Sequence, residues 1–503
     1  MQEKPYDIVI IGAGLGGLLS AALLSKEGYK VCVLEKNKQI GGCLQSFGFD
    51  GKLFESAVHY IGSLDEGQTL YKIFRYLGLM EKLQLLRLDT ECFDEIRFGE
   101  KIFKMAQGHA SFIDTLSVSF PNERNGIDAY IREMCHVCEH FPMYNLRIGN
   151  AEEKQAVSRF GLKEKLDSLT ENELLKQVLT GNNLLYGGHY QYTPFYLHAL
   201  IENSYIESSF KCRDGSTQIA RLLQEVIQQQ GGEVLRNADI QRLVEKDGLL
   251  LYAEDSNGEQ YHAAHFISNL HPQRTYRMLD SNMIRPIARR RFDTLPNTLS
   301  SFVVNISLKE KRIPFVNHNI YSHTTEDAWH DAHRSVIDTP TSFGIFFAED
   351  KQHPGYAASL SILTYMDASA TSSWDHSFHT TSERDKREEA YQQFKQQHIV
   401  DIIGSLQSVI PGLKEAVKAV DASTPLTYRD YLNSPEGTMY GIQKDVRRLA
   451  ESTLATRTKI PNLYLTGQNI NLHGVLGVSI TAVLNAADFV GLEYLVKKIN
   501  AAE

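Results

Sequence analysis

The feature that most constrains the fold of this chain is a glycine-rich turn between a short apolar run and a helix. Residues 6–11 read Tyr-Asp-Ile-Val-Ile-Ile, a β-branched run typical of a buried parallel strand. Gly12-Ala13-Gly14-Leu15-Gly16-Gly17 follows at once, and the small, apolar residues 18–26 predict a buried helix. A second strand is predicted over residues 30–34, which completes a β-α-β unit of about 30 residues. The chain is therefore expected to adopt an α/β fold.

The spacing of these glycines is that of a dinucleotide-binding turn. Gly12 permits the tight turn, Gly14 lets the backbone approach a pyrophosphate, and Gly17 lets the helix pack close to the strand. The helix N-terminus then offers free N–H groups to the phosphates. Glu35 ends the second strand, where a carboxylate accepts hydrogen bonds from ribose hydroxyls. We predict that this turn, including Gly16, binds a dinucleotide; a chance glycine-rich turn is the alternative.

Composition narrows the class of protein. The 503 residues include 52 Lys and Arg against 61 Asp and Glu, a net charge of −9, which argues against a dedicated nucleic-acid-binding protein. Six cysteines are too few for a disulfide framework. No run reaches the roughly 20 apolar residues of a membrane-spanning helix, and the first residues lack the apolar core that we would expect of a secretory signal. We expect a cytoplasmic protein, with peripheral membrane contact and the oligomeric state left open.

Strand-to-helix patterns recur near the start, the middle and the end of the chain. A helix predicted over residues 217–230 leads into several strands, and a strand over 462–466 precedes a C-terminal helix. The stretches between them are richer in aromatic residues and less regular. We predict a discontinuous Rossmann-type FAD-binding domain with an inserted α+β substrate-binding domain. The first comprises residues 1–80, 205–300 and 450–503, and the second comprises 81–204 and 301–449.

A second glycine pair favours FAD over NAD as the cofactor. Gly41-Gly42 follows Glu35 closely, as in flavoproteins of the glutathione-reductase and amine-oxidase superfamily, which this region resembles. No second strand-associated G-x-G-x-x-G occurs, so we expect no separate NAD(P)H-binding domain. External NAD(P)H, a carrier protein, quinone and oxygen all stay open as electron partners. Lys36 is expected to lie near the adenosine or to be simply exposed.

Four segments resemble the family of phytoene desaturases, carotenoid isomerases and retinol saturases. They are the glycine-rich turn with its ribose carboxylate, residues 54–62, residues 213–244, and residues 464–468 with 474–478. In this family the strand that begins at the position of Ile240 lies against the adenine, and the last segment closes over the flavin rings. The resemblance thus implies cofactor contacts from Ile240, Gly467, Gln468, Gly477 and Val478. Ala57, Cys43 and Asp214 depart from the family pattern.

The resemblance implies an FAD-dependent oxidoreductase acting on C–C double bonds of an apolar isoprenoid or polyene. A retinol-saturase-like reductase is the first expectation. A carotenoid or phytoene desaturase, a redox-neutral carotenoid cis–trans isomerase, and a non-enzymatic lipid-binding protein of the GDP-dissociation-inhibitor type are the alternatives. Alkene reduction needs a hydride and a proton. His59 is the expected proton donor, with a structural role as its alternative.

Aromatic residues supply the candidate substrate contacts. Tyr60, next to His59, and Tyr190 and Tyr192, in an aromatic-rich stretch, can line a tunnel for an apolar chain or belong to an ordinary core. Cys135 and Cys138 form a C-x-x-C, but no second ligand pair accompanies them, so we expect no metal site. An arginine cluster can contact anionic lipid or form a solvated face; it comprises Arg285, Arg289, Arg290 and Arg291.

Overall fold

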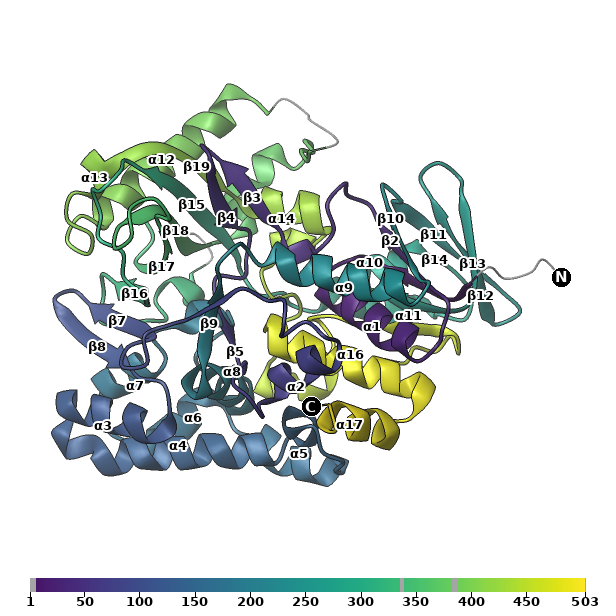
Figure 1. Cartoon of the computed structure of the whole chain (residues 1–503), viewed down its shortest axis with the longest axis horizontal. Helices are drawn as coiled ribbons and strands as arrows, with labels where there is room; N and C mark the ends of the chain where they lie inside the picture. Colours follow the sequence, from purple (N-terminus) through teal and green to yellow (C-terminus); the bar gives the residue numbers. More distant parts are fainter. Residues whose placement is uncertain (1–5, 335–338, 382–386, 503) are drawn as a thin grey trace.

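Two β-sheets of different construction organise the chain (Figure 1). The computed structural model describes residues 6–334, 339–381 and 387–502. The first sheet has eight strands in the order β10-β2-β1-β13-β12-β11-β14, with β20 also pairing with β13. The second has seven strands in the order β19-β15-β18-β17-β16-β7-β8. The candidate site lies between these two sheets.

The first sheet is parallel where the glycine-rich turn leaves it. Strands β10, β2, β1, β13 and β20 run parallel, and β12 and β11 continue the sheet as an antiparallel pair. This arrangement confirms the predicted α/β class. Its strands are β1 (Tyr6–Ile11), β2 (Val31–Glu35), β10 (Glu233–Arg236), β11 (Ile240–Lys246), β12 (Leu249–Asp255), β13 (Gln260–Ser268), β14 (Leu279–Asp280) and β20 (Leu463–Leu465).

Strand β1 is buried on both faces, which explains its unbroken apolar sequence. Because side chains alternate across a strand, Ile8 and Ile10 enter one core and Val9 and Ile11 enter another. The first core also holds α1, which packs between α9 and α16. Helices α2 and α17 extend this layer. These helices are α1 (Leu15–Lys26), α2 (Thr69–Tyr76), α9 (Thr217–Gln229), α16 (Gly474–Val490) and α17 (Leu492–Asn500).

The second sheet is antiparallel except where β16 runs parallel to β7. One face packs on α12 through Phe302, Ile362 and Ile402. The other face turns Phe346 and Leu363 towards the helical layer. Its strands are β7 (Asp94–Phe98), β8 (Lys101–Met105), β15 (Ser300–Leu308), β16 (Asn319–His323), β17 (Ser342–Glu349), β18 (Ala357–Met366) and β19 (Val417–Ser423).

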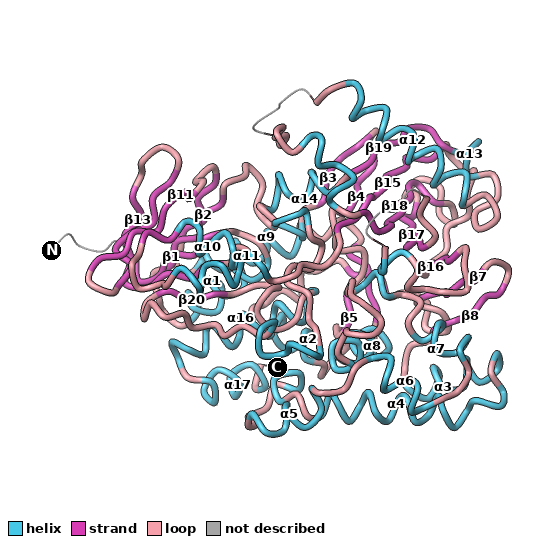
Figure 2. Tube along the Cα trace, turned by 180° about the vertical axis from the view of Figure 1, so that it is seen from behind, coloured by secondary structure: helices cyan, strands magenta, loops and turns pink. Residues whose placement is uncertain are grey.

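A layer of helices lies below the second sheet, as Figure 2 shows from behind. It comprises α3 (His109–Ser119), α4 (Arg124–Glu139), α5 (Ala151–Ser158), α6 (Leu162–Leu169), α7 (Glu173–Leu179) and α8 (Phe195–Glu207). The remaining helices are α10 (Pro272–Met278), α11 (Pro286–Thr294), α12 (Glu389–Ser405), α13 (Leu413–Ala416), α14 (Pro425–Leu432) and α15 (Leu449–Ser452). Within the described residues, none of the helices combines the length and apolar character needed to cross a bilayer.

Two small β-structures connect the large sheets. A hairpin of β3 (Ser46–Phe49) and β4 (Lys52–Glu55) packs against β18. A three-stranded sheet pairs β9 (Ser209–Cys212) with β5 (Ile61–Gly62) and β6 (Leu85–Arg87). The chain thus passes between the sheets several times, consistent with discontinuous domains. The exact division predicted from the sequence stays a prediction.

Asn462 joins the two halves of the first sheet where β13 changes partners. Its buried side-chain amide accepts from Leu250 N at 2.8 Å and donates to Leu250 O at 2.9 Å and Ala264 O at 3.0 Å. Replacing it by alanine leaves buried backbone groups without partners, and each costs about 1–3 kcal/mol. We expect Asn462→Ala to lower the free energy of unfolding by about 2–3 kcal/mol, measured by urea denaturation. The exposed Asn257→Ala is the control, and equal effects of both substitutions would contradict this role.

Candidate dinucleotide site

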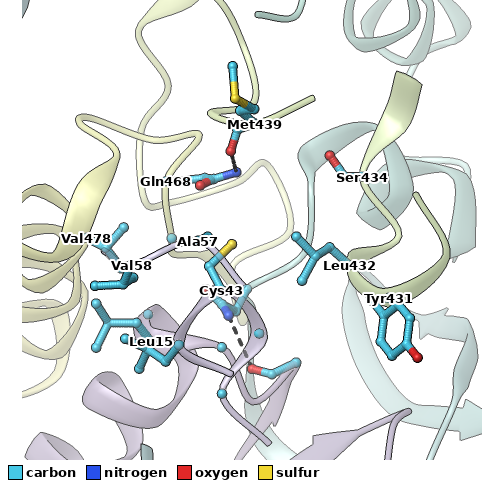
Figure 3. A pocket seen from close by; sticks show the side chains of 18 of the residues that line it. Leu15, Cys43, Ala57, Val58, Tyr431, Leu432, Ser434, Met439, Gln468 and Val478 are labelled. Atoms are coloured by element: carbon cyan, nitrogen blue, oxygen red, sulfur yellow. Dashed lines mark hydrogen bonds between the residues drawn. The ribbon is translucent and has the colours of Figure 1, made fainter. Parts of the chain in front are cut away.

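A cavity of about 1720 Å³, partly open to solvent, begins at the carboxyl ends of β1 and β2 and reaches the second sheet. We call it the dinucleotide cavity. Figure 3 shows part of its wall, to which Leu15, Cys43, Tyr431 and Gln468 contribute. This space, which includes the solvent at its mouth, extends from the glycine-rich turn at Gly12 to Tyr321 and Phe346 on the second sheet. One cavity therefore connects the turn with the second sheet.

The glycine-rich turn is built by close backbone contacts. Gly12 has a φ of +95° and donates its N–H to Leu34 O at 2.8 Å. A β-carbon on Gly17 would lie 2.1 Å from Gly12 O, so Gly17 serves the packing of helix on strand and does not line the cavity. Gly12, Gly14 and Gly16 do line it. The start of α1 therefore presents bare backbone to the cavity, as phosphate binding requires.

Asn269 is a site residue that the motif search does not identify. It is the first residue after β13, and its Nδ2 donates to Gly12 O at 3.3 Å. A β-carbon on Gly16 or on Gly467 would lie 2.5 or 2.6 Å from its Oδ1. Its amide therefore fills the space that the glycines leave. The sequence feature that could have identified Asn269 is its position as a polar residue directly after a predicted strand.

Glu35 is fixed by the loops on either side of it. Its carboxylate accepts from Ala13 N at 3.0 Å and from Asn37 N at 2.9 Å, and its side chain faces the cavity near Ile240. Burial raises the pKa of Glu35, while these hydrogen bonds act to lower it. Lys36 also lines the cavity, and its Nζ donates to Asp430 O at 2.6 Å. The predicted adenosine-side residues are thus together.

The second glycine pair, Gly41 and Gly42, packs against the glycine-rich turn that follows β1. Gly41 donates to Ala13 O at 2.8 Å with a φ of +116°. A β-carbon on Gly42 would lie 3.2 Å from the α-carbon of Gly14. The two loops therefore approach each other closely at the place expected for a pyrophosphate. Both glycines line the cavity.

The N-terminus of α16 closes the opposite side of the cavity. Gly474 and Val478 line the wall with Gly467 and Gln468, and the Gln468 amide donates to Met439 O at 3.4 Å (Figure 3). The positive end of the helix dipole thus faces the cavity. Gly477 was expected among the cofactor contacts, but it lies outside this wall, since a β-carbon there would be 2.4 Å from that of Leu472. It allows the tight entry into the helix.

His59 reaches the cavity stacked on Phe346. Their ring centroids lie 4.0 Å apart with an angle of 1° between the planes. Burial, followed by the charge of Lys211, lowers the pKa of His59 to about 3. The imidazole is therefore neutral near neutral pH, which disfavours its expected use as a cationic proton donor.

Tyr60 belongs to a buried hydrogen-bond chain that starts at the cavity wall. The hydroxyls of Tyr60 and Tyr321 are 2.9 Å apart, and Tyr60 donates to Asp94 Oδ2 at 2.8 Å. Asn182 links Asp94 to Glu202 with contacts of 3.3 and 3.0 Å. Burial raises the pKa of Asp94 to about 6 and that of Glu202 to about 8. This chain can hold a proton near neutral pH, directly beside the cavity.

Tyr190 and Tyr192 do not line the dinucleotide cavity, which corrects the expected substrate contacts. The Tyr190 ring stacks on Trp329 at 5.4 Å, and the Tyr192 ring lies 3.2 Å below the Arg447 guanidinium. Aromatic composition alone did not indicate which face these rings occupy. The substrate end of the wall is formed by other apolar residues, namely Leu184, Leu185, Tyr205, Leu363, Met439 and Tyr440.

The C-x-x-C motif and the arginine cluster make contacts within the fold. Cys138 is buried against the carbonyl of Ala199, and Cys135 lies beside His109. The Arg289 guanidinium donates to three backbone carbonyls, and that of Arg291 donates to the carbonyls of residues 450 and 451. Contact of the arginine cluster with lipid stays a prediction.

Several known proteins are similar to this chain in sequence. A family model described as an NAD(P)-binding Rossmann-like domain matches residues 10–77. The all-trans-retinol 13,14-reductase of Homo sapiens is 29% identical over 533 residues, which cover 96% of this chain and 85% of the relative. Prolycopene isomerase 1 of an Oncidium hybrid cultivar is 24% identical over 537 residues, which cover 100% and 87%. The chain is thus similar over nearly its full length to proteins of the retinol saturase and prolycopene isomerase family.

The structural comparison supports the same fold. Cyclohexylamine oxidase from Brevibacterium oxydans superposes with a TM-score of 0.61 at 12% identity, covering 97% of this chain and 100% of the oxidase. This chain therefore has a Rossmann-like α/β fold similar to that of the amine oxidases. By its sequence similarity, it is a flavin oxidoreductase related to retinol saturase and carotenoid isomerases.

We predict that Gly17→Ala prevents stable assembly of the cofactor site. The new methyl group would meet the Gly12 carbonyl oxygen, and overpacking of this kind costs about 1–3 kcal/mol. The purified variant should lose most of its visible flavin absorbance and melt at a lower temperature. Gly404→Ala, in α12 with open space around it, is the matched control and should change stability by less than about 1 kcal/mol. Full flavin content in Gly17→Ala would contradict the packing argument.

Proposed function

We propose that this protein is an FAD-dependent reductase of C–C double bonds in an apolar isoprenoid or polyene. The observation that carries the proposal is one cavity with two kinds of wall. Glycines and Glu35 form one end, and apolar and aromatic side chains form the other. The reductase named among the relatives supports reduction over desaturation or isomerisation.

The residues present fit FAD. Glycines at 14, 16 and 42 leave room that β-carbons would fill, and the N-terminus of α16 faces the cavity. Glu35 would hold the ribose, the start of α1 the pyrophosphate, and Gln468 with Val478 the flavin end. When bound, FAD supplies hydride transfer. External NAD(P)H is the donor we propose for its reduction.

The apolar wall would orient the substrate. Leu184, Tyr205 and Leu363 come from different elements and face the cavity beyond His59. Such a wall excludes water and binds an elongated hydrocarbon through its area rather than through specific hydrogen bonds. An apolar substrate would have to be collected from a membrane surface, so peripheral membrane contact belongs to this proposal.

The buried hydrogen-bond chain would supply the proton that alkene reduction requires. Protonated Asp94 can donate to Tyr60, and Tyr60 to Tyr321, whose ring lies at the cavity wall. The Asn182 amide donates to both Asp94 and Glu202, so a second carboxyl, whose pKa burial raises to about 8, lies close to this chain without being a step in the proton path. Tyr321 therefore replaces His59 as the proton donor that we propose.

A single-turnover experiment tests the reductase assignment. The bound flavin is reduced chemically without oxygen, all-trans-retinol is added, and the flavin and polyene absorption bands are followed together. We expect flavin reoxidation with an equal loss of polyene conjugation. A polyene shift with the flavin still reduced would indicate isomerisation instead. The absence of a flavin band in the purified protein would contradict the enzymatic proposal.

We predict that Tyr321→Phe slows flavin reoxidation about 100-fold, within the range typical of general acids. In the wild type the rate should be high below the pKa of Asp94, about 6, and should fall as the pH rises above it, because the donor must be protonated. The variant should lose this pH dependence and keep its affinity for the polyene. Tyr356→Phe, a partly exposed tyrosine, is the control. An unchanged pH profile in Tyr321→Phe would exclude this proton path.

A further inference from the structure

A second cavity adjoins the dinucleotide cavity. It encloses about 1550 Å³, partly open to solvent, between the β3–β4 hairpin, β9 and the β17–β18 pair. We call it the side cavity. His59 and Phe346 line both cavities, so their stacked rings stand at the boundary. The side cavity therefore lies next to the dinucleotide cavity, with only the His59 and Phe346 side chains lining both.

Lys211 on β9 lines the side cavity and is 9% exposed. Its Nζ makes one long hydrogen bond, 3.5 Å to Phe347 O, although an ammonium group has three donors. Within the described ranges, no carboxylate lies within the 4 Å of an ion pair with it. Burial lowers the pKa of Lys211 to about 8, so it is largely charged near neutral pH. A buried cation without a counter-ion is costly, which indicates that a partner is missing.

The other charged groups around the side cavity are less buried or already have partners, and Lys52 is the half-buried cation among them. Lys351 at the mouth pairs with Asp214, and Glu55 accepts hydrogen bonds from Ser216. Arg213 is exposed. The lining between them is mostly apolar and includes Leu53, Phe54, Leu86, Phe315 and Phe347. Lys211 is thus a single buried positive charge at the inner end of an apolar passage.

The groups that face Lys211 define the anion it can take. Asp94 is the carboxylate whose charge acts on Lys211, but this group accepts hydrogen bonds from Tyr60, Asn182 and Asn319. Burial lowers the pKa of His59, so this neighbour adds no positive charge near neutral pH. One cation balances the single charge of a carboxylate. A phosphate ester, with nearly two charges, would lack a second buried cation, and an alcohol would leave the charge of the ammonium unbalanced.

We propose that the side cavity holds the carboxylate of an apolar, unsaturated acid, with Lys211 as its counter-ion. The hydrocarbon chain extends past His59 and Phe346 into the dinucleotide cavity, where its double bonds meet the flavin. This assignment rests on the proposed function and names its substrate class: a polyene acid rather than the alcohol or the hydrocarbon.

Binding of a matched ligand pair tests the assignment. All-trans-retinoic acid and all-trans-retinol share one chain and differ at the head group, and isothermal titration calorimetry on the purified holoprotein measures both. We expect the wild type to bind the acid at least tenfold more tightly than the alcohol. Lys211→Met should remove this preference by weakening the acid alone, whereas Lys211→Arg should keep most of it. Lys351→Met, which removes a cation from the mouth, should leave the preference intact.

Three results would overturn the assignment. They are equal wild-type affinity for acid and alcohol, equal weakening of both ligands in Lys211→Met, and displacement of retinoic acid by equimolar acetate, which would mark a general anion site. The wild-type comparison decides the matter even if Lys211→Met fails to fold. Because binding is measured without turnover, an inactive protein that still prefers the acid would contradict the reductase proposal and leave the Lys211 site standing.

Discussion

The close contact of backbone segments at the end of β1 is the constraint on which the rest of the structure depends. The Gly12 carbonyl oxygen contacts Gly17 within α1 and receives the Asn269 amide from the end of β13. The same amide fills the space beside Gly467. Three distant parts of the chain therefore meet where side chains are nearly absent. That meeting leaves polar backbone exposed at one point of an otherwise apolar interior, and a phosphate-containing cofactor satisfies it.

The position of the second sheet follows from the same core. Strand β7 comes early in the chain but pairs in parallel with β16, more than 200 positions later, so Asp94 lies beside Asn319 and Tyr321. This long-range pairing buries a carboxyl group against the cavity wall. In a low-dielectric setting, hydrogen bonds rather than counter-ions keep that group in place, and its proton affinity rises. The fold thus places the hydrogen-bond chain of Tyr60 and Asp94 on one side of the cavity and the glycine-rich turn with Glu35 on the other.

The residues at the cofactor end of the cavity could be predicted from the sequence, because their spacing along the chain is local. The residues at the other end could not, because they come together only through long-range strand pairing. The turn at Gly12, the carboxylate at Glu35 and the pair at Gly41 lie within one continuous segment, and their spacing carries the geometry. No sequence motif marks Lys211 or Tyr321. Each reaches its cavity through the pairing of strands that are distant in sequence, β9 with β6 for Lys211 and β16 with β7 for Tyr321. Tyr190 was expected to contact the substrate, but it lies outside the wall of the dinucleotide cavity. An aromatic-rich stretch predicts that its rings are buried but does not predict which cavity or core they face. Gly477 matched the family pattern, yet it serves helix entry rather than the cavity wall.

The arrangement of charges bears on the choice between reduction and isomerisation. A redox-neutral isomerase returns what it takes from the substrate and needs no net proton, whereas a reductase consumes one proton in each turnover. The linked carboxyls of Asp94 and Glu202 lie at the end of a hydroxyl chain that begins at the cavity wall. Burying two carboxyls together is expensive unless at least one stays protonated. A fold that maintains such a pair beside the cavity holds a proton near the place proposed for the substrate, and this supports the proposal of net reduction.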